Sequence, residues 1–132
     1  MTLSTQQLEE LQQRRNKITE GGGADKLEKR RAKGLMTARE RLQALFVANT
    51  FQEVGMHIRH TAQHFGMDKK ELAADGVVCG TGYVDGRVVA AFSQDFTVAA
   101  GTLGKMHAEK MVMLMQFAMK MGIPVVAFKD SG

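Results

Sequence analysis

The sequence has 132 residues, 44% of them hydrophobic, and this predicts one domain with a buried core rather than a disordered tail. Its net charge of +4 is concentrated in the first half of the chain. No apolar run approaches the ~20 residues of a membrane helix, the start lacks the pattern of a signal peptide, and the single Cys79 allows no internal disulfide. These features favour a cytoplasmic protein with no membrane span.

Three helices are expected in the first 50 residues. Ser4 is a candidate N-cap for an exposed amphipathic helix that ends at the glycines of residues 21–23. A second helix can occupy residues 25–34. Thr37 and Glu40 form a capping-box pattern, because the hydroxyl and the carboxylate can each satisfy a free backbone amide, and this predicts the start of a third helix.

The second and third of these helices carry a dense set of cations. Such a set could attract an anionic partner, for example nucleic acid or a phosphorylated ligand, although a solvated helix face is the plainer interpretation. We expect no nucleic acid, because Trp is absent and the few aromatic residues are not interleaved with this run. The residues are Lys26, Lys29, Arg30, Arg31, Lys33, Arg39 and Arg41.

The middle of the chain changes from helical to strand periodicity. Residues 77–84 and 87–92 read as two strands, and the Asp85 and Gly86 pair between them suits the positive φ angles of a two-residue turn. This stretch therefore predicts an antiparallel hairpin.

The last third predicts a strand, a loop of small residues, a helix over residues 105–121 and a final strand over residues 123–128. Gly122 is a candidate C-cap, and Pro124 opens the final strand. This order indicates a right-handed crossover between parallel strands, and hence an α/β fold.

Six of the ten methionines fall in the helix over residues 105–121. A Met-rich face can be an adaptable binding surface, but an apolar helix that covers a sheet is commoner, so we expect these residues to be core. They are Met106, Met111, Met113, Met115, Met119 and Met121.

The histidines and the cysteine are weak site candidates. His57, His60 and His64 could share one helix face and hold zinc, but that region has no clear helical signal and no acidic partner, so we expect no metal. His107 is expected to be a surface or packing residue, and Cys79 a buried small one.

The loop of residues 101–104 has the composition of a phosphate or ligand cradle, since glycines permit close backbone approach and a helix N-terminus follows. The pattern matches neither of the glycine-rich nucleotide-binding motifs. By itself the loop is a weak signal.

Taken together, these segments resemble the amino-terminal part of the carboxyltransferase (beta) subunit of biotin-dependent acyl-CoA carboxylases. The similarity is greatest to the branch with propionyl-CoA carboxylase, methylmalonyl-CoA carboxyltransferase and methylmalonyl-CoA decarboxylase. It rests on blocks in one order: residues 21–23, 32–34, 37–42, 64–67, 75–78, 92–98, 107–110 and 130–132.

The resemblance implies a partial crotonase-like fold, in which backbone amides polarise the thioester carbonyl of an acyl-CoA. Carboxyl transfer to the carbon beside a thioester passes through an enolate, whose oxygen needs aimed donors. Gly132 is the candidate oxyanion amide, with a plain strand-to-loop glycine as the alternative. The candidate CoA groove is Ser93, Gln94, Asp95, Phe96, Gly101, Thr102, Leu103 and Gly104.

The resemblance also implies a domain organisation and partners. Residues 1–50 would be a helical extension, and residues 51–132 the first part of a truncated carboxyltransferase domain, expected to be inactive in isolation. The substrate would be an acyl-CoA, with biotin on a partner carrier protein, a biotin carboxylase component, no covalently bound cofactor, and a homo-oligomer in the full-length form. The alternative is a non-catalytic interaction or assembly module.

Overall fold

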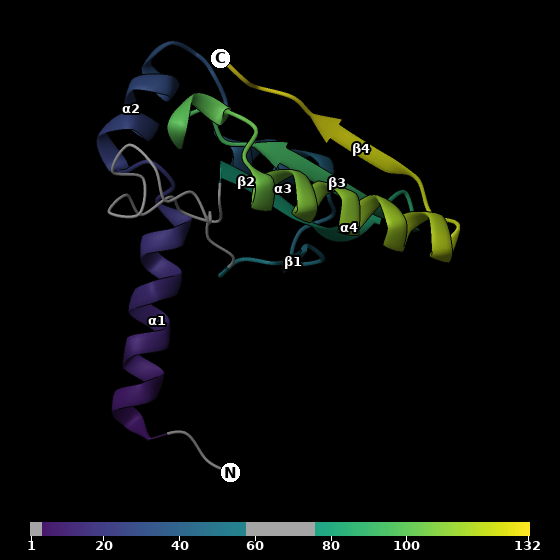
Figure 1. The fold of residues 1–132 in the computed structure, drawn as a ribbon, viewed down its shortest axis with the longest axis horizontal. Helices are drawn as coiled ribbons and strands as arrows, with labels where there is room; N and C mark the ends of the chain where they lie inside the picture. Colours follow the sequence, from purple (N-terminus) through teal and green to yellow (C-terminus); the bar gives the residue numbers. More distant parts are fainter. Residues whose placement is uncertain (1–3, 58–75) are drawn as a thin grey trace.

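The computed structural model describes residues 4–57 and 76–132. Its amino-terminal part is helical as predicted, with α1 (Thr5–Thr19), α2 (Ala24–Ala32) and α3 (Ala38–Leu45). Both predicted caps are confirmed: the Ser4 hydroxyl accepts from the Gln7 amide, and the Thr37 hydroxyl from the Glu40 amide, each within a capping box. Helix α1 buries no side chain and extends away from the rest of the chain (Figure 1).

Four strands form one sheet in the order β1 (Gln52–Val54), β2 (Val77–Val84), β3 (Arg87–Gln94) and β4 (Val125–Phe128). Strands β2 and β3 are antiparallel and β3 and β4 are parallel, so the hairpin and the parallel crossover are confirmed. At the hairpin turn, Asp85 has a φ of 48° and Gly86 one of 76°, the positive pair that a type I′ turn requires. The short strand β1, which the sequence patterns do not predict, pairs with β2.

The two faces of the sheet carry separate core clusters, because successive side chains of a strand point to opposite sides. On one face, Val78 and Ala91 pack with Leu42 of α3. On the other, Cys79 and Phe92 pack with residues of α4 (Lys105–Met121). Figure 1 shows α4 lying across the sheet with β4 beside it.

The prediction that the methionines of α4 are core is wrong for most of them. Met113, Met115, Met119 and Met121 are exposed, Met119 by 80%. The helix has apolar residues on more than one side, but a helix on one sheet buries only one stripe of its surface. Here that stripe is His107, Lys110, Leu114 and Ala118.

Two polar members of this stripe are satisfied inside the fold. The Lys110 ammonium donates to the Val77 carbonyl at 2.7 Å, and His107 is fully buried, which confirms a packing histidine. Cys79 is buried as predicted, and burial raises the pKa of its thiol to about 11.

Two of the three histidines considered for zinc, His60 and His64, lie outside the described residues. Within residues 4–57 and 76–132, no three His, Cys, Asp or Glu side chains come close enough to hold a metal ion. No helix in the same ranges has the length and hydropathy of a membrane span.

Candidate functional site

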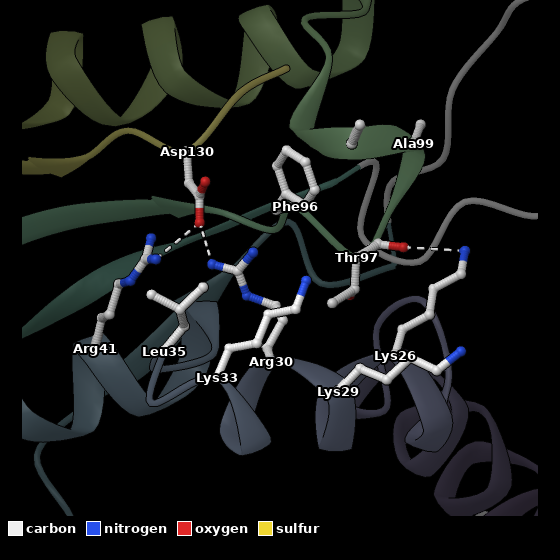
Figure 2. Close-up of a pocket in the computed structure, with 11 residues that line it drawn as sticks. Lys26, Lys29, Arg30, Lys33, Leu35, Arg41, Phe96, Thr97, Ala99 and Asp130 are labelled. Atoms are coloured by element: carbon white, nitrogen blue, oxygen red, sulfur yellow. Dashed lines mark hydrogen bonds and ion pairs between the residues drawn. The ribbon is translucent and has the colours of Figure 1, made fainter.

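A cavity of about 660 Å³ lies between α2 and the chain that follows β3 (Figure 2). One wall is basic and comes from α2 and α3. The opposite wall is formed by residues just after β3, and Asp130 closes the site from the end of β4. The cations on the basic wall are Lys26, Lys29, Arg30, Lys33 and Arg41.

The basic wall arises from helical geometry. Positions 29, 30 and 33 are three, four and seven residues after position 26, so α2 and its C-cap residue Lys33 present these cations on one face. The Lys26 ammonium reaches the Thr97 carbonyl at 3.4 Å. No hydrogen bond or ion pair joins the side-chain ammonium of Lys29 or Lys33 to another described residue, which leaves two ammonium groups at the cavity for an anion.

Phe96 supplies a flat aromatic surface in the cavity. The residue is 40% exposed, and the Arg30 guanidinium carbon lies 5.3 Å from the ring centroid, within range of a cation–π interaction. An aromatic ring beside lysines can stack a planar group while cations hold a charged one.

Asp130 contributes a carboxylate to the cavity. Its Oδ2 accepts from Arg30 Nη2 at 2.5 Å and from Arg41 Nη2 at 2.7 Å. The Asp130 side chain is 23% exposed and the arginines 13% and 19%, so these ion pairs are partly shielded from solvent. One carboxylate therefore joins α2 and α3 to the end of β4.

The backbone of Asp130 is held as well. Its amide donates to Gln94 Oε1 at 2.9 Å, and Gln94 Nε2 lies 3.3 Å from His107 Nε2. Gln94 is the last residue of β3, and His107 is in the first turns of α4. The segment that leaves β4 is thus tied to three other elements of the fold.

A left-handed turn lies against this segment. Ala99, Ala100 and Gly101 have φ angles of 47°, 54° and 67°. This conformation is costly for alanine, by roughly 1–2 kcal/mol per residue, so its surroundings must hold it in place. One such contact is the hydrogen bond from the Gly132 amide to the Ala100 carbonyl, at 2.8 Å.

The loop between α1 and α2 docks on the same region. The Gly22 amide donates to Thr97 Oγ1 at 3.0 Å, and the Thr97 amide donates to Asp95 Oδ1 at 2.9 Å. A Cβ on Gly22 would lie only 1.9 Å from the Thr97 carbonyl oxygen. This close approach holds the start of α2 beside the cavity.

Of the eight residues predicted to form a CoA groove, the structure places Phe96 in the cavity wall. Ser93, Gln94 and Asp95 are buried and are not part of the cavity wall, and Gly101 is buried against Asp130. Thr102, Leu103 and Gly104 are exposed and are not part of the cavity wall. The Ser93 hydroxyl has no hydrogen-bond partner among the described residues.

From the sequence, the basic run and the predicted groove after β3 are separate candidate sites. The structure brings five cations of that run and one residue of the groove, Phe96, together in one cavity. The predicted groove did not include Thr97, Ala99, Ala100 or Asp130. The one available signal was the helical spacing of the cations on α2, which indicates a basic face without indicating what lies opposite.

Comparison with known proteins identifies the class of this fold and site. The family model described as the carboxyl transferase domain matches residues 29–132. Because this match spans most of the chain, the chain belongs to the carboxyl transferase domain family. The predicted family and the α/β, crotonase-like fold are confirmed.

Individual relatives agree with this assignment. The chain is 50% identical over its whole length to the methylmalonyl-CoA decarboxylase subunit alpha of Propionigenium modestum, and covers 26% of that protein. It is 44% identical, over 95% of its length, to the propionyl-CoA carboxylase beta chain of Cereibacter sphaeroides, and covers 24% of it.

Among solved structures, a transcarboxylase 12S subunit crystallised as a hexamer with hydrolysed methylmalonyl-coenzyme A matches all of this chain. The TM-score is 0.95 at 42% identity, and the match covers 26% of that subunit. The chain thus spans about a quarter of the length of the relatives it matches.

Proposed function

We propose that this chain contributes the acyl-CoA binding part of a carboxyltransferase that moves a carboxyl group between carboxybiotin and an acyl-CoA such as propionyl-CoA or methylmalonyl-CoA. The observation that carries the proposal is the basic cavity with an aromatic wall, directly beside residues 130–132. The family membership and the substrates in the names of the relatives support it.

The cavity suits the nucleotide end of CoA. CoA carries phosphate groups and an adenine ring at one end and an acyl thioester at the other. Lys29 and Lys33 can bind phosphates, and Phe96 with Arg30 offers a surface on which a planar base can stack. A volume of about 660 Å³ lies within the usual range of ligand pockets, about 300–1,000 Å³.

The reaction needs donors for the oxygen of the enolate that forms beside the thioester. We assign the Gly132 amide to this role. It donates to the Ala100 carbonyl in this structure and would exchange that hydrogen bond for one to the thioester oxygen. Carboxybiotin, presented by a separate carrier protein, would supply the carboxyl group. A homo-oligomer is also part of the proposal, by analogy with the hexameric relative.

A titration of the isotope-labelled chain with CoA, followed by amide chemical shifts, tests the proposal. We expect a dissociation constant on the order of 1 mM, about −4 kcal/mol. Shifts should appear in both walls, at residues 96–100 and along α2. Shifts confined to α2 would indicate a nonspecific basic surface and contradict the proposal.

Two truncated ligands make the test more specific. Pantetheine lacks the nucleotide and its phosphates, so it should not shift α2. Inorganic pyrophosphate should shift α2, and the shifts should weaken between 0.1 and 1 M salt because screening shortens the reach of the cations. Equal binding of CoA and pantetheine would rule out the nucleotide assignment.

A second candidate is a non-catalytic assembly module. The observation in its favour is the exposed apolar face of α4 that Val112, Met115 and Met119 share at helical spacing. Contiguous apolar surface of this kind often marks a contact with another protein surface. Concentration-dependent sedimentation of the chain, with no response of the cavity to CoA, would favour this candidate.

A further inference from the structure

We propose that Asp130 is a positioning residue that links the charge of the basic cavity to the position of the Gly132 amide. The inference rests on the proposed function, since it names what prepares the candidate oxyanion donor. Two sets of contacts carry it: those of the Asp130 side chain and those of its backbone.

The side-chain contacts place Asp130 in the cavity. Its carboxylate accepts from Arg30 and Arg41 at 2.5 and 2.7 Å, and all three residues are part of the cavity wall. In Figure 2 both guanidinium groups point at the same carboxylate oxygen. Both arginines are already paired with Asp130 when an anion enters the cavity. The carboxylate therefore lowers the positive potential that the anion experiences.

The backbone contacts connect Asp130 to the donor two residues on. The Asp130 amide is held by Gln94, whose side chain is in turn against the fully buried His107. The Asp130 carbonyl lies directly over Gly101, and the Gly132 amide reaches Ala100. Residues 130–132 therefore lie along the left-handed turn, with the carboxylate as their anchor on the cavity side.

Two opposite effects follow when the Asp130 charge is removed. Asp130→Asn keeps the shape and the backbone amide but weakens both ion pairs, so residues 130–132 lose their anchor. The same change removes the one acid among the described residues of the cavity wall and should strengthen binding of an anion. If Asp130 only stabilised the fold, its replacement would weaken ligand binding.

The test uses the labelled 132-residue chain with inorganic pyrophosphate as the probe. For Asp130→Asn we expect pyrophosphate to bind about threefold tighter, and the Gly132 amide to exchange with solvent at least tenfold faster. Asp130→Glu restores the charge and should return the affinity to within about twofold of the parent. Asp85→Asn, in the hairpin turn at the other end of β3, is the matched control and should change neither quantity.

Arg41→Gln provides a second variant if Asp130→Asn does not fold. This variant keeps the ion pair between Arg30 and Asp130 but removes one cation of the cavity wall. It should weaken pyrophosphate binding while still accelerating hydrogen exchange at the Gly132 amide. Unchanged exchange at Gly132 in both variants would overturn the inference. Absence of pyrophosphate binding in every form, with faster exchange at Gly132, would instead overturn the proposed function and leave the positioning role supported.

Discussion

The carbonyl oxygen of Asp130 occupies the space that a side chain on residue 101 would need. A Cβ built on Gly101 lies 2.0 Å from that oxygen, far inside the contact distance of the two atoms. Gly101 also has a φ of 67°, where residues with a side chain are strained. The left-handed turn and the segment after β4 can lie this close to each other only because residue 101 is glycine.

Replacement of Gly101 by alanine should therefore cost more than backbone strain alone. Gly34 provides the matched control, because its φ of 73° is similar but a Cβ there would meet no atom within 4 Å. We expect Gly34→Ala to lower the free energy of unfolding by about 1 kcal/mol and Gly101→Ala by at least about 2 kcal/mol more. Urea unfolding of the two variants measures the difference. Equal losses would show that residues 130–132 move away from the new side chain with no further loss in the free energy of unfolding.

Substitution at the hairpin turn should show the cost of positive φ without a clash. Gly86 has a φ of 76° and open space around its Cβ position. A β-branched residue is disfavoured there, so Gly86→Val should destabilise the chain by roughly 1–3 kcal/mol. Gly86→Asn should lose less, because asparagine tolerates this conformation. A valine variant as stable as the parent would contradict the observed turn.

Loss of Lys29 and Lys33, whose ammonium groups have no hydrogen-bond or ion-pair partner in the described part of the chain, should weaken CoA binding. We expect the double variant Lys29→Gln and Lys33→Gln to raise the dissociation constant about three- to tenfold at 0.1 M salt, and less at 1 M. The double variant Lys105→Gln and Lys120→Gln on α4 makes the same change of net charge away from the cavity. An equal effect of both pairs in calorimetric titration would indicate that only net charge matters.

The buried stripe of α4 should dominate its contribution to stability. Leu114 is 3% exposed and packs with Cys79 and Phe92, so Leu114→Ala should cost about 2–5 kcal/mol. Met119 is 80% exposed, so Met119→Ala should change the free energy of unfolding by less than about 0.5 kcal/mol. Thermal and urea unfolding of the chain at low concentration check both values, and a large loss for Met119→Ala would indicate that its face is covered in solution.

The Cys79 thiol should make stability depend on alkaline pH. Burial raises its pKa from 9.0 to about 11, so the folded chain holds this proton more tightly than the unfolded chain. The contribution of the thiol is therefore complete below about pH 9 and is lost as the pH rises towards 11. Cys79→Ala should show a shallower decline in stability over this window, measured by urea unfolding at several pH values. Parallel curves for the two chains would disprove the shift.

Local features of the fold follow from the sequence alone. The caps at Ser4 and Thr37, the turn at Gly86 and the bounds of α4 were all predicted, because each depends on residues within about one turn of helix or one tight turn. The basic face of α2 is local for the same reason, since it follows from helical spacing.

Long-range features were decided only by the tertiary structure. The partners of Asp130 lie 89 and 100 residues away in the chain, and no local pattern indicates which arginine will meet which acid. Which stripe of α4 is buried, and hence the exposure of Met119, depends on how a helix with apolar residues on more than one side is rotated on its sheet. The left-handed turn at Ala99 and Ala100 opposes the preference of alanine, so packing against residues outside the turn must impose it.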